Sequence, residues 1–211
     1  LSVQYYCHAD SNSPLPAGQA SFQALSAYQE CAELDKQALA VYDNVPDQTG
    51  QRPFDLPATL AREHYHPLPP FLGNEKAHNT LWSLKQGFAR YAGAPGFYRA
   101  IEVRPSESHS VTRLAYDRYN CHITSVSAAD GGSTHAVHDY RLLLPIVVTD
   151  PQGNVQQAHY DAFGQLQATS FYGQERGKPA GFAPLSQYRR PADDSPGAAI
   201  KDPAAALHNA A

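Results

Sequence analysis

The clearest alternation of apolar and polar residues lies between Leu142 and Phe171. An apolar run, 142–148, precedes the turn residues Asp150-Pro151-Gln152-Gly153-Asn154, and a polar stretch ending at Tyr160 precedes a second turn, 161–164. In both turns an initial Asp can accept backbone hydrogen bonds, and a later Gly adopts positive φ at no steric cost. The pattern therefore predicts three strands joined by two tight turns.

Further strands are predicted at 97–103, 111–116 and 121–127, which are rich in aromatic and β-branched residues and are separated by Pro, Ser, Asp and Asn. Pro145 lacks the backbone N–H that a strand needs for its ladder. Its strand is therefore expected to lie at a sheet edge or to contain a bulge. The fold class predicted after residue 92 is mainly β.

The first third of the chain shows a different pattern. Residues 19–42 contain no Gly or Pro and have apolar residues about every three positions, which predicts a helix in two pieces with a break near Asp35. Residues 43–75 carry several prolines among aromatic residues and predict an ordered loop with short strands. For 80–91, the spacing of Leu81, Leu84, Phe88 and Tyr91 fits a helix, but Gly87 and the β character of the chain beyond residue 92 favour a hairpin.

The C-terminal tail is rich in Ala and Pro, and Asp202-Pro203 before 204–211 is typical of the start of a short helix. These patterns divide the chain into three segments. Residues 1–92 form a mixed helix and loop segment, residues 93–188 form a β region, and residues 189–211 form a connector with a short helix.

The β region contains an internal repeat. The pairs Tyr116-Asp117, Asp139-Tyr140 and Tyr160-Asp161 place tyrosines 24 and 20 residues apart, and the turns beginning at Asp130 and Asp150 are 20 apart. A period near twenty residues is typical of stacked β-repeats, in which each unit buries its apolar face against its neighbours. Ordinary hairpins of similar sequence are the alternative.

Composition narrows the possible function. The net charge is −4, only 17% of residues are charged, and no run of Lys or Arg exceeds two, so no nucleic-acid or direct membrane contact is expected. The absence of Met together with a Leu1 start suggests a fragment of a longer chain. Three scattered cysteines, Cys7, Cys31 and Cys121, favour buried free thiols over a disulfide scaffold or zinc site.

Candidate chemical motifs are weak. Residues 173–179 resemble a P-loop, but the spacing is one residue short and Pro179 stands where Ser or Thr would bind magnesium. His64 and His66 would share one strand face near His78, without further ligands at a useful spacing, whereas His135 and His138 would point to opposite faces. Asp193-Asp194 suggests a solvated loop. No catalytic, cofactor-binding or metal-binding residue is predicted.

Tyr160-Asp161-Ala162-Phe163-Gly164-Gln165-Leu166 resembles the Y-D-x-x-G-x-L signature of RHS (YD) repeats, and the stretch 114–120 resembles a weaker copy with Asn120 in place of Gly. The stretches 139–154 and 171–182 are similar to the repeat-bearing part of the B component of bacterial insecticidal toxin complexes (Tc toxins). The stretches 14–18 and 28–39, Trp82, and Phe97-Tyr98 are similar to the region that precedes the repeats there, so the resemblance covers most of the chain.

This resemblance implies a scaffold and no enzyme. In that family, RHS repeats coil a β-sheet into a hollow shell that encloses a cytotoxic domain of a C-type component, and a propeller on the same subunit docks onto an A-type pore-forming component. A secreted toxin complex, no cofactor and no catalytic residue are therefore expected. The alternative is a YD-repeat surface protein that binds carbohydrate on its tyrosines, although tyrosines at repeat spacing favour ladders between neighbouring strands.

Overall fold

The computed structural model describes residues 1–16, 18–19, 21–46, 50, 55–68, 81–188, 193 and 195–203. It contains two compact units, Leu1–Arg113 and Leu114–Ala211. This division does not test the boundaries predicted at 92 and 188, which stay predictions. Both units are built mainly from antiparallel strands with a few short helices, which confirms the mainly β fold class.

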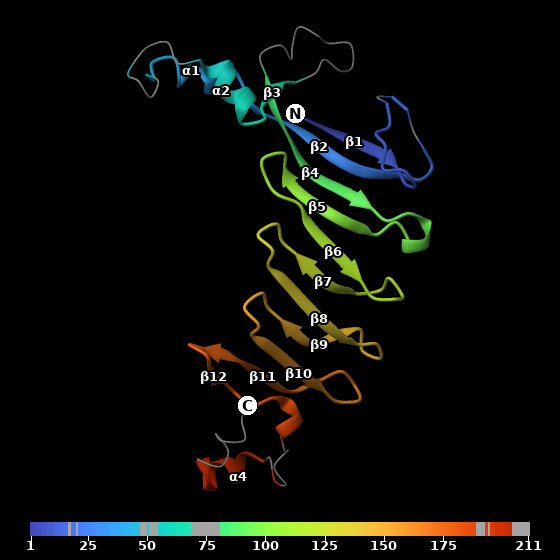
Figure 1. Cartoon of the computed structure of the whole chain (residues 1–211), viewed down its shortest axis with the longest axis vertical. Coiled ribbons are helices and arrows are strands. Elements are labelled where there is room, and N and C mark those ends of the chain that lie inside the picture. The colour runs from blue at the N-terminus through green and yellow to red at the C-terminus, as the bar shows by residue number, and fades with distance from the viewer. Residues whose placement is uncertain are drawn as a thin grey trace. The chain divides into compact units, whose positions relative to one another are not determined.

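Unit 1 is an antiparallel sheet in which neighbouring strands follow chain order (Figure 1). Its strands are β1 (Ser2–His8), β2 (Ala24–Leu34), β3 (His66–Pro67), β4 (Trp82–Tyr91) and β5 (Ala100–Ser106). The order is β1-β2-β4-β5, and the two residues of β3 pair with the start of β4. Strand β6 (Thr112–Tyr116) begins at the end of this unit, where Thr112 and Arg113 pair with β5.

The helix predicted over 19–42 is wrong, because Ala24–Leu34 forms the strand β2. Its residues are good helix formers, but β2 pairs with β1 over residues 24–31 and with β4 over residues 29–34. Pairing on both sides outweighs a weak local preference. The break expected near Asp35 is real: Asp35 caps the short helix α1 (Lys36–Ala40) by accepting a hydrogen bond from the Ala38 amide at 2.8 Å.

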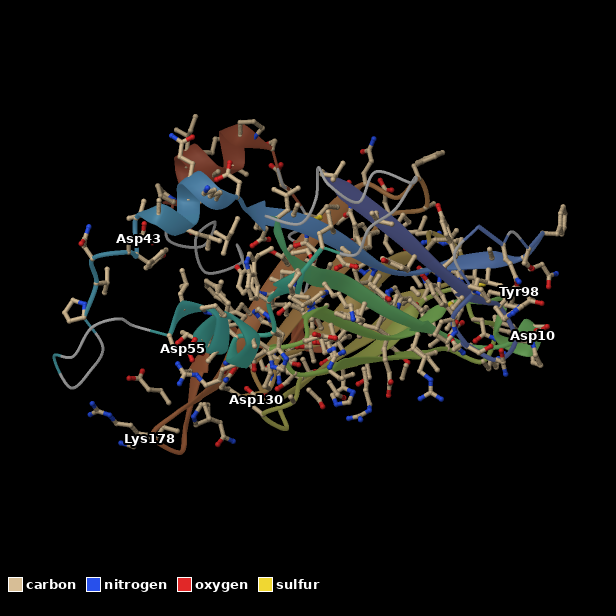
Figure 2. The ribbon with its side chains drawn as sticks, turned by 90° about the horizontal axis from the view of Figure 1, so that it is seen from above. Asp10, Asp43, Asp55, Tyr98, Asp130 and Lys178 are labelled. Atoms are coloured by element: carbon tan, nitrogen blue, oxygen red, sulfur yellow. The ribbon has the colours of Figure 1, made fainter. Side chains whose placement is uncertain are left out.

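The prediction of loop and short strands for 43–75 missed a second helix, α2 (Leu56–Arg62). Asp55 caps it through the Ala58 amide at 3.0 Å, and Pro57 occupies its first turn, where a missing N–H costs nothing. Figure 2 labels Asp55 at the start of this helix. The two-residue strand β3 in the same region agrees with the prediction of short strands.

The hairpin predicted around Gly87 is also wrong, because Trp82–Tyr91 is one continuous strand, β4. Gly87 has a positive φ of 67° in the middle of this strand. Gln86 and Phe88 on either side of it pair with Ser106 and Arg104 of β5, so the glycine bends the strand without reversing it. A 3₁₀ turn, η1 (Ala94–Gly96), then leads into β5.

Unit 2 continues as strand, turn and strand. Its strands are β7 (Ile123–Ser127), β8 (Ser133–Asp139), β9 (Leu144–Thr149), β10 (Val155–Tyr160), β11 (Leu166–Glu175) and β12 (Lys178–Gly181), followed by the 3₁₀ turn η2 (Leu185–Gln187) and helix α4 (Pro196–Lys201). Each strand pairs with the next one in the chain (Figure 1). The three strands predicted between Leu142 and Phe171 are confirmed as β9, β10 and β11. The helix predicted over 204–211 lies outside the described residues.

The bulge predicted at Pro145 is confirmed. Val137 pairs with Val147 whereas His138 pairs with Pro145, so β9 has one more residue than β8 at this point. Strand β9 also pairs with β10 on its other side, so it is a central strand and the alternative of an edge strand is wrong. The bulge allows Pro145 to occupy a central strand.

Burial differs between the units. In unit 1 the buried apolar residues among those described are Cys7, Ala9, Leu15, Leu60 and Leu68. In the described part of unit 2 the buried residues, Asp117 and Ser170, are polar, and large apolar side chains such as Phe163 (89% exposed) and Phe182 (59% exposed) face solvent. Within its described residues, unit 2 is thus a single-layered sheet whose apolar surface is covered only in part.

Candidate functional site

The turns at one end of the unit 2 strands form a regular series. Asp117, Asp139 and Asp161 each begin a turn, and 139−117 and 161−139 both equal 22. At the opposite ends of the strands, the turns that begin at Ala128 and Asp150 are also 22 residues apart. The period predicted from tyrosines, 24 and 20, therefore averages a true period of 22 that is set by the first residue of each turn.

The turns that begin with Asp are closed by the aspartate side chain. The Asp161 carboxylate accepts hydrogen bonds from the amides of Phe163 (2.8 Å) and Gln165 (2.9 Å), and Gly164 has φ 82°. Asp150 accepts in the same way from the amides of Gln152 (2.9 Å) and Asn154 (2.8 Å). Local sequence dictates this geometry, because Asp and Gly satisfy the turn without tertiary contacts.

Two turns in the series replace Gly with a larger residue. Asn120 takes the left-handed conformation with φ 56°, as its alignment with the repeat signature predicts, since Asn tolerates this region best among non-glycine residues. Leu143 has φ 59° in the turn after Asp139, which is strained for a branched apolar side chain.

Side chains connect the successive turns. The Tyr140 hydroxyl donates to the Asp117 carboxylate at 2.7 Å, and the Arg141 guanidinium donates to the carbonyl of Asp161 at 3.3 Å. The rings of Tyr119 and Tyr140 meet edge to face, with centroids 5.5 Å apart. The turn at 139–143 is thus joined to both of its neighbours, so its aromatic and charged residues keep the repeats in register.

Asp117 is the most strongly held of these carboxylates. Its burial opposes ionisation, but hydrogen bonds from the His122 amide, the Tyr140 hydroxyl and the Cys121 amide outweigh it and lower the Asp117 pKa to about 2. The same carboxylate raises the pKa of Tyr140 above its usual value. At neutral pH the connection between these two turns is therefore a charge-assisted hydrogen bond from the neutral Tyr140 hydroxyl to the ionised Asp117 carboxylate.

Two histidines lie beside this connection. The rings of His122 and His138 stack with centroids 4.5 Å apart and planes 14° apart, and Tyr140 contacts the His122 ring edge to face at 5.6 Å. The Nε2 atom of His122 is enclosed and has no hydrogen-bond partner among the described residues. Burial, followed by the neighbouring His122, lowers the pKa of His138.

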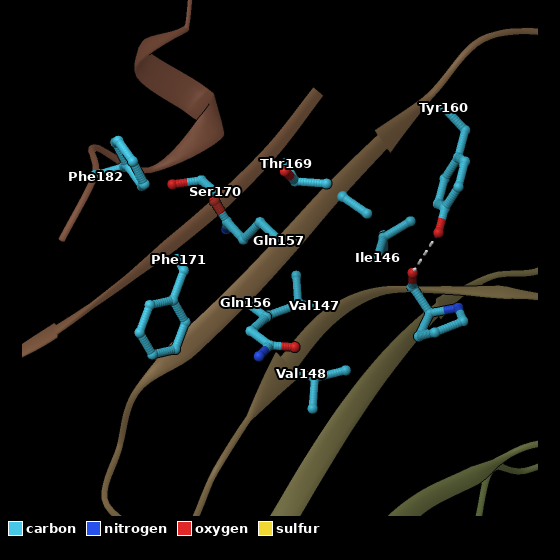
Figure 3. A pocket seen from close by; sticks show the side chains of 12 residues that line it. Ile146, Val147, Val148, Gln156, Gln157, Tyr160, Thr169, Ser170, Phe171 and Phe182 are labelled. Atoms are coloured by element: carbon cyan, nitrogen blue, oxygen red, sulfur yellow. Dashed lines mark hydrogen bonds between the residues drawn. The ribbon is translucent and has the colours of Figure 1, made fainter. Parts of the chain in front are cut away.

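A shallow groove of about 380 Å³ crosses strands β9, β10 and β11 (Figure 3). Its apolar lining comes from Pro145, Ile146, Val147, Val148, Ala158, Tyr160, Phe171 and Phe182. Gln156 and Thr169 add polar atoms, and the Tyr160 hydroxyl lies 3.4 Å from the Pro145 carbonyl. A groove with this lining and no charged residue suits apolar side chains better than an ionic ligand.

The segment after β12 packs against the same strands. The Ser170 hydroxyl donates to the Ala183 carbonyl at 2.6 Å, and the Leu185 amide donates to the Gln157 side chain at 2.8 Å. These contacts explain why Ser170 is buried in an otherwise exposed sheet.

Unit 1 contains a buried carboxylate. Glu30 on β2 is 1% exposed and accepts hydrogen bonds from the hydroxyls of Ser83 (2.6 Å) and Tyr5 (3.0 Å), and the Nε2 atom of His66 lies 2.7 Å from the same carboxylate. Burial, together with the bond to Glu30, raises the pKa of Tyr5 to about 12. Ser83 is fully buried because β2 and β3 pair with β4 on either side of it.

This cluster of Ser, His and Glu is not arranged for nucleophilic catalysis. Ser83 Oγ and His66 Nε2 both bond to the same oxygen of Glu30. A catalytic serine must give its proton to the histidine, whereas here the proton points at the carboxylate. The arrangement instead gives a buried carboxyl group its hydrogen-bond partners and joins β1, β2, β3 and β4.

The histidines and the glycine-rich stretch considered as metal or phosphate sites do not form such sites among the described residues. His64 and His66 do not share a strand face, because His64 follows α2 with φ 67° and only His66 belongs to β3. His78 lies outside the described residues. The described residues contain no group of three or more potential metal ligands. Residues 173–179 form the β11–β12 hairpin with Arg176 and Gly177 at its turn, so this stretch is a glycine-containing turn between strands and not a P-loop.

The predictions of buried free thiols and of a solvated loop at Asp193-Asp194 can be compared with the structure only in part. All three cysteines are free, but only Cys7 is buried, whereas Cys31 is half-buried and Cys121 is exposed. Hydrogen bonds from the Ser195 side chain and from the Ser195 amide, the latter at 3.0 Å, lower the pKa of Asp193. Asp194 lies outside the described residues.

An aromatic ladder is present, but in unit 1. Tyr5 stacks on Tyr28 with centroids 4.6 Å apart, Tyr28 stacks on Phe88 at 5.1 Å, and the Arg104 guanidinium lies 4.5 Å from the Phe88 centroid. These residues come from β1, β2, β4 and β5 in order. These rings are not the repeat-spaced tyrosines Tyr116, Tyr140 and Tyr160, so a ladder among the repeat tyrosines stays a prediction.

Sequence reasoning missed the Glu30 cluster and the His122–His138 pair. Glu30 carries no local signal, since its burial arises from strands far apart in the sequence. The histidine pair could have been found from hairpin register: Ser125 pairs with His135, and three further steps along both strands bring His122 opposite His138.

No protein-family model and no curated protein sequence matches the chain. Solved structures do. The crystal structures of TcdB2-TccC3-Cdc42 and TcdB2-TccC3-TEV match with TM-scores of 0.81 and 0.80 at 23% and 24% identity. The Photorhabdus luminescens Tc holotoxin pore matches with a TM-score of 0.81 at 23% identity.

In each comparison the match covers 95% of this chain and 9% of the other chain. No helix among the described residues has the length and apolar character needed to span a membrane. At this level of identity the likeness establishes the fold: the chain folds as a short segment of the TcdB2-TccC3 Tc toxin complexes does.

Proposed function

We propose that this chain is a wall segment of a Tc toxin B-type subunit and that its function is to enclose, not to catalyse. The observation that carries the proposal is the match over 95% of the chain to complexes whose names join TcdB2 with TccC3. The proposed partners are a C-type component with a cytotoxic domain and, through another part of the subunit, an A-type pore-forming component. The proposed location is a secreted toxin complex.

The single-layered sheet of unit 2 supports this function. Its turns repeat every 22 residues and are joined side by side, which suits extension into a longer wall. None of the described residues covers its apolar groove and exposed aromatic side chains, as expected when one face of a wall meets an enclosed polypeptide. The Glu30 cluster and the Asp117 turn are arranged to hold strands together, not to react with a substrate.

Electron microscopy of the full-length protein, produced together with its C-type component, tests the proposal. We expect a closed particle with this chain in its wall and density for a second polypeptide inside. A particle without an internal cavity would exclude an enclosing function.

The carbohydrate-binding alternative has less support, because Tyr5, Tyr28 and Phe88 stack on one another and leave less ring surface for a sugar. A glycan array with the full-length protein separates the two functions. Saturable binding to one sugar class, lost on Tyr28→Ala but kept in Tyr119→Ala, would favour the alternative.

A further inference from the structure

The connection between the first two turns of unit 2 brings together four side chains that respond to protons: Asp117, His122, His138 and Tyr140. We call this group the histidine seam. We propose that the seam is an acid-sensitive contact between the two turns. The contact is intact when both imidazoles are neutral, and it opens when one of them takes up a proton. The inference is independent of the proposed function, because it concerns only contacts within unit 2.

The geometry of the two rings is favourable only while both are neutral. Their centroids are 4.5 Å apart and their planes nearly parallel, which suits stacked neutral imidazoles. Two imidazolium rings at this distance would repel each other, and the partial burial of the pair limits screening by water. Double protonation is therefore incompatible with the stack.

A single proton is also poorly accommodated. Protonated histidine carries an N–H on both ring nitrogens and needs two acceptors. The Nε2 of His122 is enclosed without an acceptor among the described residues. Opening the turn would expose this nitrogen to water, so protonation favours the open state.

The surrounding charges do not remove this sensitivity. The turn before β7 contributes Asp117, Arg118, Tyr119 and Cys121, the turn after β8 contributes Asp139, Tyr140 and Arg141, and β9 brings Pro145 opposite His138. The anion that acts on His138 is Asp117, and its oxygens already accept from Tyr140 and from the amides of Cys121 and His122. Arg118 is a competing cation beside Tyr119.

The direction of the pH effect is set by linkage. The folded pKa of His138 lies below its usual value, so the unfolded chain binds more protons as the pH falls below about 6.5. Stability is therefore unaffected above that pH and decreases as the pH approaches the folded pKa. The Asp117 carboxylate, with a pKa of about 2, stays ionised throughout this window and contributes nothing to the change.

Hydrogen exchange with mass spectrometry on the full-length protein tests the seam, after correction for the intrinsic pH dependence of exchange. We expect amide protection in 117–123 and 138–143 to fall between pH 7.5 and 5.5, by up to about tenfold for each pH unit that separates the folded and unfolded pKa values. His138→Phe keeps a stacking ring but removes one of the two imidazoles that can bind a proton, so its protection should depend less on pH in this range than that of the wild type. His159→Gln, at an exposed histidine of β10, is the matched control and should behave as the wild type.

The same pH dependence in the wild type and His138→Phe would overturn the inference. If the amides of His138→Phe are already unprotected at pH 7.5, this comparison is replaced by a direct one. The pKa values of His122, His138 and His159 in the wild type are then measured by hydrogen exchange at the imidazole carbon. A value for His138 at or above that of His159 would equally overturn it.

Discussion

Glu30 shows how much one buried side chain contributes in a thin sheet. Its carboxylate is the shared acceptor for Ser83 and Tyr5 and the partner of His66, from three different strands. Replacing it by Ala removes the common acceptor of the buried Ser83 hydroxyl and of the half-buried Tyr5 and His66 side chains. We expect Glu30→Ala to lower the free energy of unfolding of unit 1 by roughly 3 kcal/mol, measured by urea denaturation.

Glu33→Ala is the matched control, because Glu33 lies on the same strand but is exposed and bonds to Tyr65 at the surface at 2.8 Å. Its loss should cost less than about 1 kcal/mol. Equal effects of the two substitutions would show that the burial of Glu30 adds nothing to the free energy of unfolding beyond what an exposed glutamate contributes.

Leu143 is a residue whose replacement should stabilise the protein. It holds φ 59° and is 61% exposed, so the strain of a left-handed leucine is not offset by burial. Leu143→Gly should raise the free energy of unfolding of unit 2 by about 0.5–1 kcal/mol. This is the difference between the backbone strain that glycine relieves and the larger conformational entropy that glycine gives the unfolded chain. Leu166→Gly, at a 55% exposed position in strand β11, should instead lower it, since glycine weakens a strand.

At the scale of elements, the turn that begins at Asp117 should dominate acid unfolding of unit 2. The folded pKa of Asp117, about 2, lies below its unfolded value of about 4. Its contribution is therefore complete above pH 4 and is lost as the pH falls from about 4 to 2. Asp117→Asn should be less stable than the wild type at pH 6, and the difference should shrink over this range in denaturation midpoints.

Asp130→Asn is a suitable control, because Asp130 accepts a single backbone hydrogen bond, from Gly132 at 2.8 Å, in an exposed turn. A difference between Asp117→Asn and the wild type that stays constant from pH 6 to 2 would contradict the assignment. This window lies below that of the histidine seam, so the two effects can be measured separately.

Elements defined by local chemistry could be predicted from the sequence, and those defined by distant partners could not. The turns at Asp150 and Asp161 contain their own hydrogen-bond acceptors and positive-φ glycines, so a few residues suffice to identify them. Strand β2 lacks such signals and is a strand because β1 and β4 pair with it. Helix α2 does carry a local signal, the Asp55 cap and Pro57, but it lies among other prolines that favour a loop.

In the turns of unit 2, too, local features could be predicted from the sequence and contacts between distant residues could not. The repeat signature predicts the positions of Asp117 and Asp161 correctly, but it cannot show that Tyr140 reaches across to Asp117, because that bond depends on the order of strands. Likewise, His122 and His138 are sixteen residues apart in sequence and meet only through the β7–β8 pairing.

At the scale of the whole molecule, the two units differ in how they are stabilised. Unit 1 has buried apolar side chains and the Glu30 cluster, whereas unit 2 depends on strand pairing and on contacts between turns. Because these sets of contacts share no residue, loss of one set should leave local opening in the other unchanged.

Glu30→Ala should accordingly reduce amide protection in β2 and β4 by at least about tenfold while β10 and β11 keep wild-type protection, as measured by hydrogen exchange with mass spectrometry on the full-length protein. Leu143→Gly should raise protection in β8 and β9 and leave β2 unchanged. If Glu30→Ala lowers protection of β10 as much as that of β2, the two units open together. Unfolding is then cooperative across the boundary at Arg113, and the repeats are not stabilised one by one.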